Sequence, residues 1–157
     1  LVGLPGDRIA VRGGRVLLNG EPLPLRETGE TFVDASGRRF DVLVEGLGDC
    51  RHRVLDDPRQ PGLDMAPITV PPERYLFLGD NRDNSHDGRV FGTVALADLE
   101  GPAGLLYWSW DWNGSWLALL NPATWWENLS SRTRWGRMGG FVGCGLDEPV
   151  PPGPGAD

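Results

Sequence analysis

Apolar residues that alternate on both sides of a Gly-Gly pair constrain the fold of this chain more than any other sequence feature. Ile9 and Val11 precede the glycines at positions 13–14, and Val16 and Leu18 follow them. A two-residue glycine turn joins antiparallel strands, so Val11 is expected opposite Val16. Ile9 then lies opposite Leu18, and all four side chains share one face of the sheet. The pattern predicts a β-hairpin near the start of the chain.

Frequent chain breakers extend this prediction to the rest of the sequence. The 157 residues include 23 glycines and 14 prolines, about a quarter of the chain, which would interrupt the helices of a long bundle. Apolar residues make up 39%, which is enough to bury a core and argues against wholesale disorder. Asn19-Gly20 supplies a second turn directly after the hairpin. The sequence therefore predicts a mainly β, antiparallel fold.

Charge and a few special residues narrow the function classes. The net charge of −7 argues against a nucleic-acid partner, because binding phosphates needs cations that displace counterions. All 15 basic residues are arginines, and the sequence contains no lysine. Its apolar stretches are too short to span a bilayer. Cys50 and Cys144 can form a disulfide. With His52 and His86 they show no metal-ligand spacing, so we predict no metal and no cofactor.

The second segment of the chain has the character of an insertion. Residues 21–70 are polar and interrupted by proline, unlike the apolar hairpin before them. They contain two short strand candidates, residues 40–45 and 52–55, which a turn at residues 46–49 can join into a small hairpin. We therefore expect an inserted small β subdomain here, outside the main core.

The chain then returns to the main sheet. Residues 75–78 read Tyr-Leu-Phe-Leu, which is apolar on both faces and typical of a strand buried on both sides. A polar loop follows at residues 80–88, and a further strand is predicted near residues 90–96. Residues 1–142 are expected to form one domain. Residues 143–157, rich in Gly and Pro, are expected to form a disordered tail.

All seven tryptophans lie between Trp108 and Trp135. The alternation of Trp108, Trp110 and Trp112 is typical of a strand, and residues 125–138 are predicted to form a short helix. The indole rings can pack in the core, which is the more common position of aromatic side chains. They can instead border an apolar surface that rests on a lipid bilayer, because Trp prefers the membrane interface. Both interpretations remain open.

The densest polar cluster, at residues 79–89, reads Gly-Asp-Asn-Arg-Asp-Asn-Ser-His-Asp-Gly-Arg. Its Ser, His and Asp at 85–87 are consecutive, and neighbouring side chains of an extended chain point apart, so they do not fit a serine-protease triad. Residues 83–88 match the first six positions of a calcium loop, but Val94 occupies the position that needs a bidentate Glu. A solvated loop of turn-forming residues is a third interpretation.

The same cluster resembles the most specific motif of type I signal peptidases. In this chain the motif follows Val70-Pro71 and the predicted strand at residues 75–78. Residues 2–7, Val-Gly-Leu-Pro-Gly-Asp, followed by a strand and Asn19-Gly20, resemble a second motif of the family. The order of the two motifs and the insertion between them also agree. The resemblance covers residues 1 to about 100 well and residues 105–140 only loosely.

The resemblance implies a membrane-anchored serine endopeptidase that removes signal peptides from exported preproteins. Such enzymes lie in the bacterial inner membrane with the catalytic domain on its outer, periplasmic side, and use a Ser nucleophile with a neutral Lys as general base. The family motif Lys-Arg-x-Val-Gly-Leu-Pro-Gly-Asp places that Lys two residues before Leu1, and the Ser further upstream. The resemblance therefore implies an N-terminally truncated fragment that contains neither catalytic residue and is inactive alone.

The resemblance also assigns supporting roles. Ser85 would hydrogen-bond the base Lys and hold its amine toward the nucleophile. Asp87 and Arg89 would form an ion pair that stiffens the loop. Asp80 would face basic groups, such as the Arg expected just before Leu1. Gly88 departs from the Ser that is common in the family, a change we expect to be tolerated. The alternative for each of the four is a loop-stabilising residue without a direct role.

The predicted partners follow from the family. They are the signal peptides of secreted preproteins and a lipid surface at residues 108–135, with no nucleic acid. A related Ser-Lys peptidase, such as a conjugative-transfer maturation protease, is one alternative function. The other is a non-catalytic β module that binds apolar peptides through its Trp-rich face.

Overall fold

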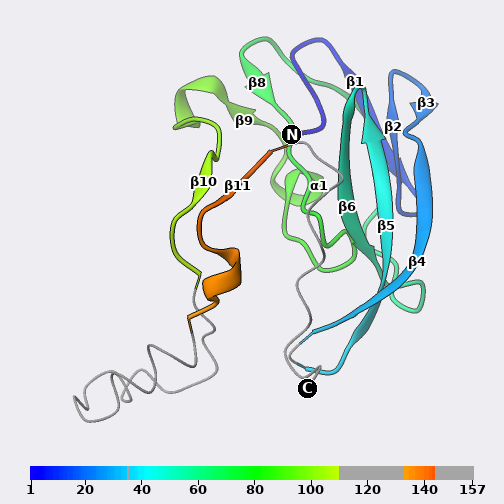
Figure 1. Ribbon diagram of the computed structural model, residues 1–157. Helices are drawn as coiled ribbons and strands as arrows, with labels where there is room; N and C mark the ends of the chain where they lie inside the picture. The colour runs from blue at the N-terminus through cyan, green and yellow to red at the C-terminus, as the bar shows by residue number, and fades with distance from the viewer. Residues whose placement is uncertain (35, 110–132, 144–157) are drawn as a thin grey trace. The chain divides into compact units, whose positions relative to one another are not determined.

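The computed structural model describes residues 1–34, 36–109 and 133–143 (Figure 1). Contacts within the chain divide these residues into two units, Leu1–Glu100 and Gly101–Gly143. Every pairing between named strands is antiparallel, which confirms the mainly β, antiparallel prediction. The tail predicted at 143–157 falls almost entirely outside the described residues.

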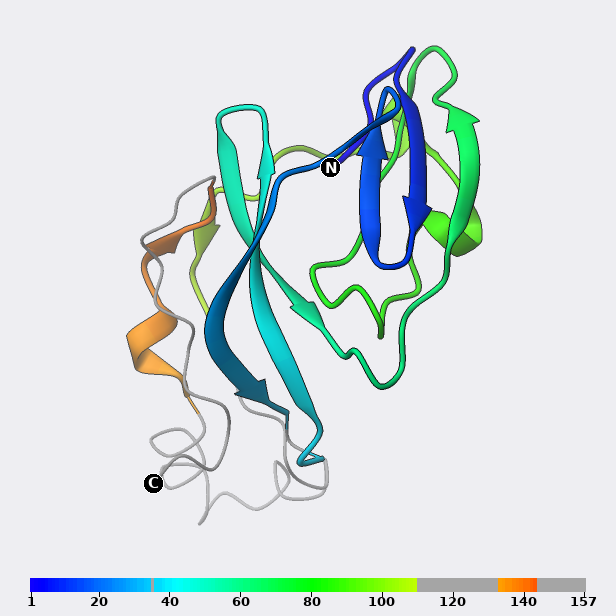
Figure 2. The same cartoon turned by 90° about the vertical axis from the view of Figure 1, so that its right-hand side faces the viewer.

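The first sheet of the larger unit contains the predicted hairpin. Val11 pairs with Val16 and Ile9 with Leu18, in the predicted register. The two turn glycines have φ values of +54° and +76°, a region that glycine enters at no steric cost because it has no Cβ. The sheet has the order β3-β2-β1-β7, and Figure 2 shows β7 beside the blue hairpin. Its strands are β1 (Arg8–Arg12), β2 (Arg15–Leu18), β3 (Glu21–Pro22) and β7 (Met65–Thr69).

One face of this sheet builds a core that reaches beyond the hairpin. Ile9, Val11 and Val16 are at most 1% exposed, and Leu18 packs against them partly buried. The remaining buried members of this cluster are Val2, Leu23, Met65, Val70 and Leu76. The core therefore holds together the N-terminus, the hairpin and the segment that leads into the polar loop.

The second sheet has the order β4-β5-β6, from Leu25–Val33, Arg39–Leu47 and Cys50–Asp56. Its β5–β6 hairpin confirms the two strand candidates of the insertion, and both strands run longer than predicted. β4 was not predicted, because most of its residues are polar and exposed at a sheet edge. Cys50 is disulfide-bonded, and Cys144 lies outside the described residues.

The segment after the first sheet differs from the prediction in two places. Of the apolar strand expected at residues 75–78, only Tyr75 lies in a named strand, β8 (Arg74–Tyr75), which pairs with β9 (Val94–Ala95). The strand predicted near residues 90–96 is wrong in its first part, because Gly88–Phe91 forms the helix α1. The Asp87 carboxylate caps this helix, a local signal that outweighs the apolar pattern of the following residues. A 3-10 turn, η1, covers Leu96–Asp98.

The smaller unit contains a short antiparallel pair, β10 (Leu105–Leu106) and β11 (Gly140–Phe141), and the 3-10 turn η4 (Trp135–Arg137). Within the helix predicted at 125–138, the described residues therefore form a 3-10 turn at the end of that range. The strand predicted through Trp110 and Trp112 lies outside the described residues. No described helix has the length and apolar character of a membrane span.

Candidate functional site

The two sequence motifs are neighbours in the fold. Gly3 and Leu76 form an antiparallel bridge, and the Leu76 N–H donates to the Gly3 carbonyl at 3.0 Å. The Val2 N–H donates back to the Leu76 carbonyl at 2.9 Å. A Cβ on Gly3 would lie 2.9 Å from Ile9 Cγ1 and 3.0 Å from Val70 Cγ2, so only glycine permits this approach. The first residues thus run alongside the segment that enters the polar loop.

The start of the polar loop is attached to β6. Leu55 N–H donates to the Asp80 carbonyl at 2.8 Å, and Arg82 N–H donates to the Leu55 carbonyl at 3.1 Å. Leu55 and Asn81 form a parallel bridge. The exposed Asp80 carboxylate accepts the Asn81 N–H at 2.9 Å and has no ion pair among the described residues. The basic partner expected for Asp80 is therefore not in this part of the chain.

A buried ion pair fixes the loop to β5. Glu45 is 1% and Arg82 3% exposed, and the guanidinium donates two hydrogen bonds to the carboxylate, one of 2.8 Å to Oε1 and one to Oε2. His52 Nε2 lies 3.2 Å from Glu45 Oε2. Burial alone raises the pKa of Glu45, but hydrogen bonds from His52 and Arg82 outweigh it and lower the pKa to about 2. Sequence reasoning missed this pair, because the partners lie in different segments.

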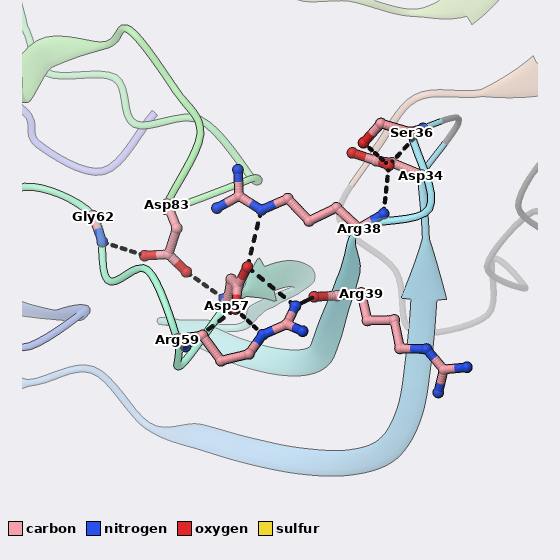
Figure 3. A network of polar contacts seen from close by, with 8 residues as sticks. All are labelled: Asp34, Ser36, Arg38, Arg39, Asp57, Arg59, Gly62 and Asp83. Atoms are coloured by element: carbon pink, nitrogen blue, oxygen red, sulfur yellow. Dashed lines mark hydrogen bonds and ion pairs between the residues drawn. The ribbon is translucent and has the colours of Figure 1, made fainter.

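A second network joins the loop to the end of β6 (Figure 3). The Asp83 carboxylate accepts the backbone N–H groups of Asp57 and of Gly62, the latter at 2.6 Å. The Asp57 carboxylate in turn accepts Nε–H bonds of 2.9 Å from both Arg38 and Arg59. The side-chain hydrogen bonds from Arg59 and Arg38 lower the pKa of Asp57. Asp83 was part of the recognised motif, but nothing in the sequence indicated its partners.

The third attachment is the predicted ion pair of Asp87 and Arg89, which the structure confirms. Arg89 donates through Nε at 2.9 Å and through its terminal nitrogen at 2.8 Å, and its side chain is 2% exposed. Asp87 Oδ2 also accepts the Gly79 N–H at 2.8 Å. Burial raises the pKa of Asp87, but the hydrogen bonds from Arg89 and Gly79 outweigh it and lower the pKa to about 2.

Ser85 lies directly over Gly79. A Cβ built on Gly79 would come within 2.1 Å of Ser85 Oγ and 2.6 Å of Ser85 Cβ. The Ser85 side chain is partly buried, and its hydroxyl makes no hydrogen bond within the described residues. Gly79 is thus the surface against which Ser85 packs, and the Gly79 peptide is itself held by Asp87.

The loop does not have the geometry of a calcium site. Asp83 uses both oxygens to accept backbone N–H groups, and both oxygens of Asp87 bond to Arg89. In the described part of the chain, no three His, Cys, Asp or Glu residues gather where they could hold a metal ion. The carboxylates of this loop therefore serve to fix the backbone around Ser85.

The sequence comparison identifies a family for this arrangement. The family model described as signal peptidase, peptidase S26, matches residues 1–108, which include both motifs and all the contacts above. The chain belongs to this signal peptidase family. The matched range includes the loop at residues 79–89 and the N-terminal residues 2–7.

Comparison with individual signal peptidases shows what fraction of their length the chain covers. Signal peptidase I of Rickettsia canadensis is 30% identical over 139 residues, which cover 82% of this chain and 47% of that protein. Signal peptidase I of Leptolyngbya laminosa is 31% identical over 108 residues, covering 69% of this chain and 39% of that protein. The probable signal peptidase I-2 of Synechocystis is also 31% identical over 108 residues, or 36% of its length. The chain spans about half the length of these relatives or less.

Gly88, which stands where Ser is common in the family, is closely packed. A Cβ on Gly88 would lie 2.6 Å from Leu76 Cδ1 and 2.7 Å from the Phe77 carbonyl oxygen. Gly88→Ser is therefore expected to destabilise the chain by about 1–3 kcal/mol, because a backbone oxygen has to move. Urea unfolding measures this, with Gly46→Ala as control, where the nearest atom to the new Cβ is 3.7 Å away. A Gly88→Ser chain as stable as the control would contradict the close packing.

Stability is expected to fall below about pH 4.5. The folded-state pKa values of Glu45 and Asp87 are lowered to about 2, so their contribution is present above their ordinary pKa values and is lost as the pH falls through about 4.5 to 2. Asp56 opposes this weakly, because burial and three neighbouring carboxylates raise its pKa. Urea midpoints between pH 7 and pH 2 measure the effect. A midpoint that stays level down to pH 3 would contradict it.

Proposed function

We propose that this chain supplies the β scaffold and part of the active-site environment of a signal peptidase I. Such an enzyme is a serine endopeptidase that removes signal peptides from exported preproteins. Family membership supports the peptidase activity. A Ser nucleophile with a Lys base is the mechanism implied by the resemblance. None of the 157 residues is a lysine, so in this proposal the base comes from a segment that precedes Leu1 in a longer protein.

The direction of the N-terminal segment supports this proposal. Gly3 pairs with Leu76 in antiparallel orientation, so a preceding segment that continued the pairing would run along residues 78–80. A residue two positions before Leu1 would then lie opposite Asp80, next to Gly79 and the Ser85 packed on it. The antiparallel bridge of Gly3 to Leu76, which directs a preceding segment toward the loop, is the single observation that carries the proposal.

Each loop residue then has a task. The Ser85 hydroxyl, which makes no hydrogen bond within the described residues, accepts a hydrogen bond from the base and keeps its amine aimed at the nucleophile. The ion pair of Asp87 and Arg89 keeps the loop rigid, because a charge-assisted bidentate pair fixes both side chains. The exposed carboxylate of Asp80 pairs with the arginine that the family motif places just before Leu1.

The test is a reconstituted enzyme, in which the anchor, serine motif and Lys-Arg pair of a signal peptidase I are joined to Leu1. We expect this chimera to cleave a preprotein in membranes. Ser85→Ala should lower kcat about a hundred-fold, the loss that an error of 1 Å in positioning produces. Ser36→Ala, in an exposed turn, is the control. A folded, membrane-bound chimera without activity would reject the proposal and favour a non-catalytic β module. An active chimera indifferent to Ser85→Ala would reject only the role of Ser85.

The smaller unit supports a lipid surface as partner, on the outer side of the bacterial inner membrane. Leu105 and Phe141 pair across β10 and β11 and are 51% and 79% exposed, while Tyr107 is 81% and Trp135 57% exposed. Apolar and aromatic side chains gathered in one unit suit the bilayer interface. Flotation of the chain with anionic vesicles tests this. The double variant Phe141→Ser, Tyr107→Ser should no longer float with the vesicles. Equal flotation of the parent chain and the double variant would reject the lipid partner.

A further inference from the structure

The Glu45–Arg82 pair is buried more deeply than a loop attachment requires. Both side chains are at most 3% exposed, and the pair joins β5 to a loop 37 positions away in sequence. Burying two charges costs several kcal/mol of desolvation, and apolar residues of similar volume are often as stabilising. Stability alone is therefore a weak explanation for this pair. What the arginine does beyond pairing with Glu45 is more informative.

Arg82 connects Glu45 to the backbone on which Ser85 packs. Two of its nitrogens bond to the Glu45 carboxylate, and its Nε donates to the Gly79 carbonyl at 3.2 Å. The Gly79 N–H is held from the other side by Asp87 at 2.8 Å. Both polar groups of Gly79 are thus fixed by ionised side chains. Because Ser85 packs directly against Gly79, fixing Gly79 also fixes Ser85.

Glu45 differs from the other members of this chain of contacts by its origin. Gly79, Arg82, Ser85 and Asp87 all belong to the recognised loop, whereas Glu45 is contributed by the middle strand of the inserted sheet. Its carboxylate is fully engaged, since His52 Nε2 approaches Oε2 at 3.2 Å while Arg82 occupies both oxygens. A fully paired buried carboxylate holds its partner in one orientation.

We propose that Glu45 is a positioning residue of this peptidase, which orients Arg82 and through it Gly79 and Ser85. The inference rests on the proposed function and extends it, because it makes the sheet β4-β5-β6 a part of the active-site environment. Glu45 touches neither substrate nor the reacting atoms. Its effect on catalysis is expected to pass entirely through the position of Ser85.

The main test is a double-mutant cycle in the reconstituted enzyme. Glu45→Gln keeps the shape of the side chain but turns an N–H group toward Arg82. We expect kcat to fall about a hundred-fold with KM unchanged. In the Ser85→Ala background the same substitution should lower kcat less than about three-fold, because the two residues act as one unit. Asp41→Asn is the matched control, since Asp41 lies on the same strand and face but is exposed.

A second variant separates positioning from stability. Glu45→Leu combined with Arg82→Met removes both charges of the pair, so neither is left buried without the other, and most of the melting temperature lost in Glu45→Gln should return. Because Arg82 is replaced, the hydrogen bond from its side chain to the Gly79 carbonyl is lost, so kcat should stay low. A variant that recovers both the melting temperature and kcat would overturn the inference, because the pair would then act only through stability.

The possible results distinguish the two proposals. An inactive parent would overturn the proposed function together with this inference. An active parent in which Glu45→Gln matches Asp41→Asn would overturn the inference alone, as would an equal loss in both Ser85 backgrounds. In the 157-residue chain, Glu45→Gln should also speed amide hydrogen exchange at Gly79 and Arg82 at least ten-fold, with β1 and β2 unchanged. Unchanged exchange at these two amides would contradict the geometry on which the inference depends.

Discussion

Gly79→Ala is expected to lower kcat of the reconstituted enzyme by a hundred-fold or more. The new methyl group would lie 2.1 Å from Ser85 Oγ and 2.6 Å from Ser85 Cβ, and Cβ atoms in proteins essentially never have neighbours closer than about 3 Å. Rotation of the Ser85 side chain relieves only the first contact, so the loop backbone has to move as well. Displacement by about 1 Å is enough for a loss of this size, and overpacking costs about 1–3 kcal/mol of stability.

The comparison with Gly46→Ala isolates the cause. Gly46 lies in the same unit, and a Cβ there would meet Pro24 at an ordinary 3.7 Å. Neither glycine has a positive φ, so backbone strain is not a factor at either position. We expect Gly46→Ala to keep kcat within about two-fold of the parent. A substitution that introduces no close contact usually has a small effect. Equal losses of kcat in Gly79→Ala and Gly46→Ala would show that the packing of Ser85 against Gly79 is not required for activity.

Local patterns predicted the parts of this fold that depend on local chemistry. The hairpin register followed from two glycines and four apolar residues, because a two-residue turn leaves one way to pair the strands with all four on one face. The Asp87–Arg89 pair was implied by the resemblance to the family motif. β4 was missed because its edge position needs no apolar alternation, so its residues read as loop. α1 was missed because the apolar residues after Asp87 are equally typical of a strand, and only the capping contact of Asp87 decides for a helix.

The long-range partners of the polar loop could not be predicted from the sequence. The motif identified the residues around Ser85, yet the partners of Arg82 and Asp83 come from β5 and the end of β6. Glu45 follows three buried apolar residues and reads as an ordinary strand residue. Only the folded sheet brings its carboxylate to Arg82. Long-range ion pairs of this kind leave no trace in a single sequence, because either partner alone is unremarkable.

Asp87→Ala is expected to destabilise the chain by about 3–5 kcal/mol, because it leaves the buried Arg89 guanidinium without its carboxylate. The substitution also removes the N-cap of α1 and the acceptor of the Gly79 N–H. The urea midpoint should therefore fall steeply and reconstituted activity should be lost. Asp98→Ala is the control, since Asp98 is an exposed acidic residue of η1 and should change the midpoint little.

A companion variant separates the two consequences of losing Asp87. Adding Arg89→Leu removes the unpaired buried charge, so most of the stability is expected to return. Activity is not expected to return, because the Gly79 N–H still lacks its acceptor and Ser85 still rests on a backbone held from one side only. A double variant that regains activity with its stability would mean that Asp87 supports the fold alone. One that regains stability without activity would place Asp87 beside Glu45 as the second side chain that positions Ser85.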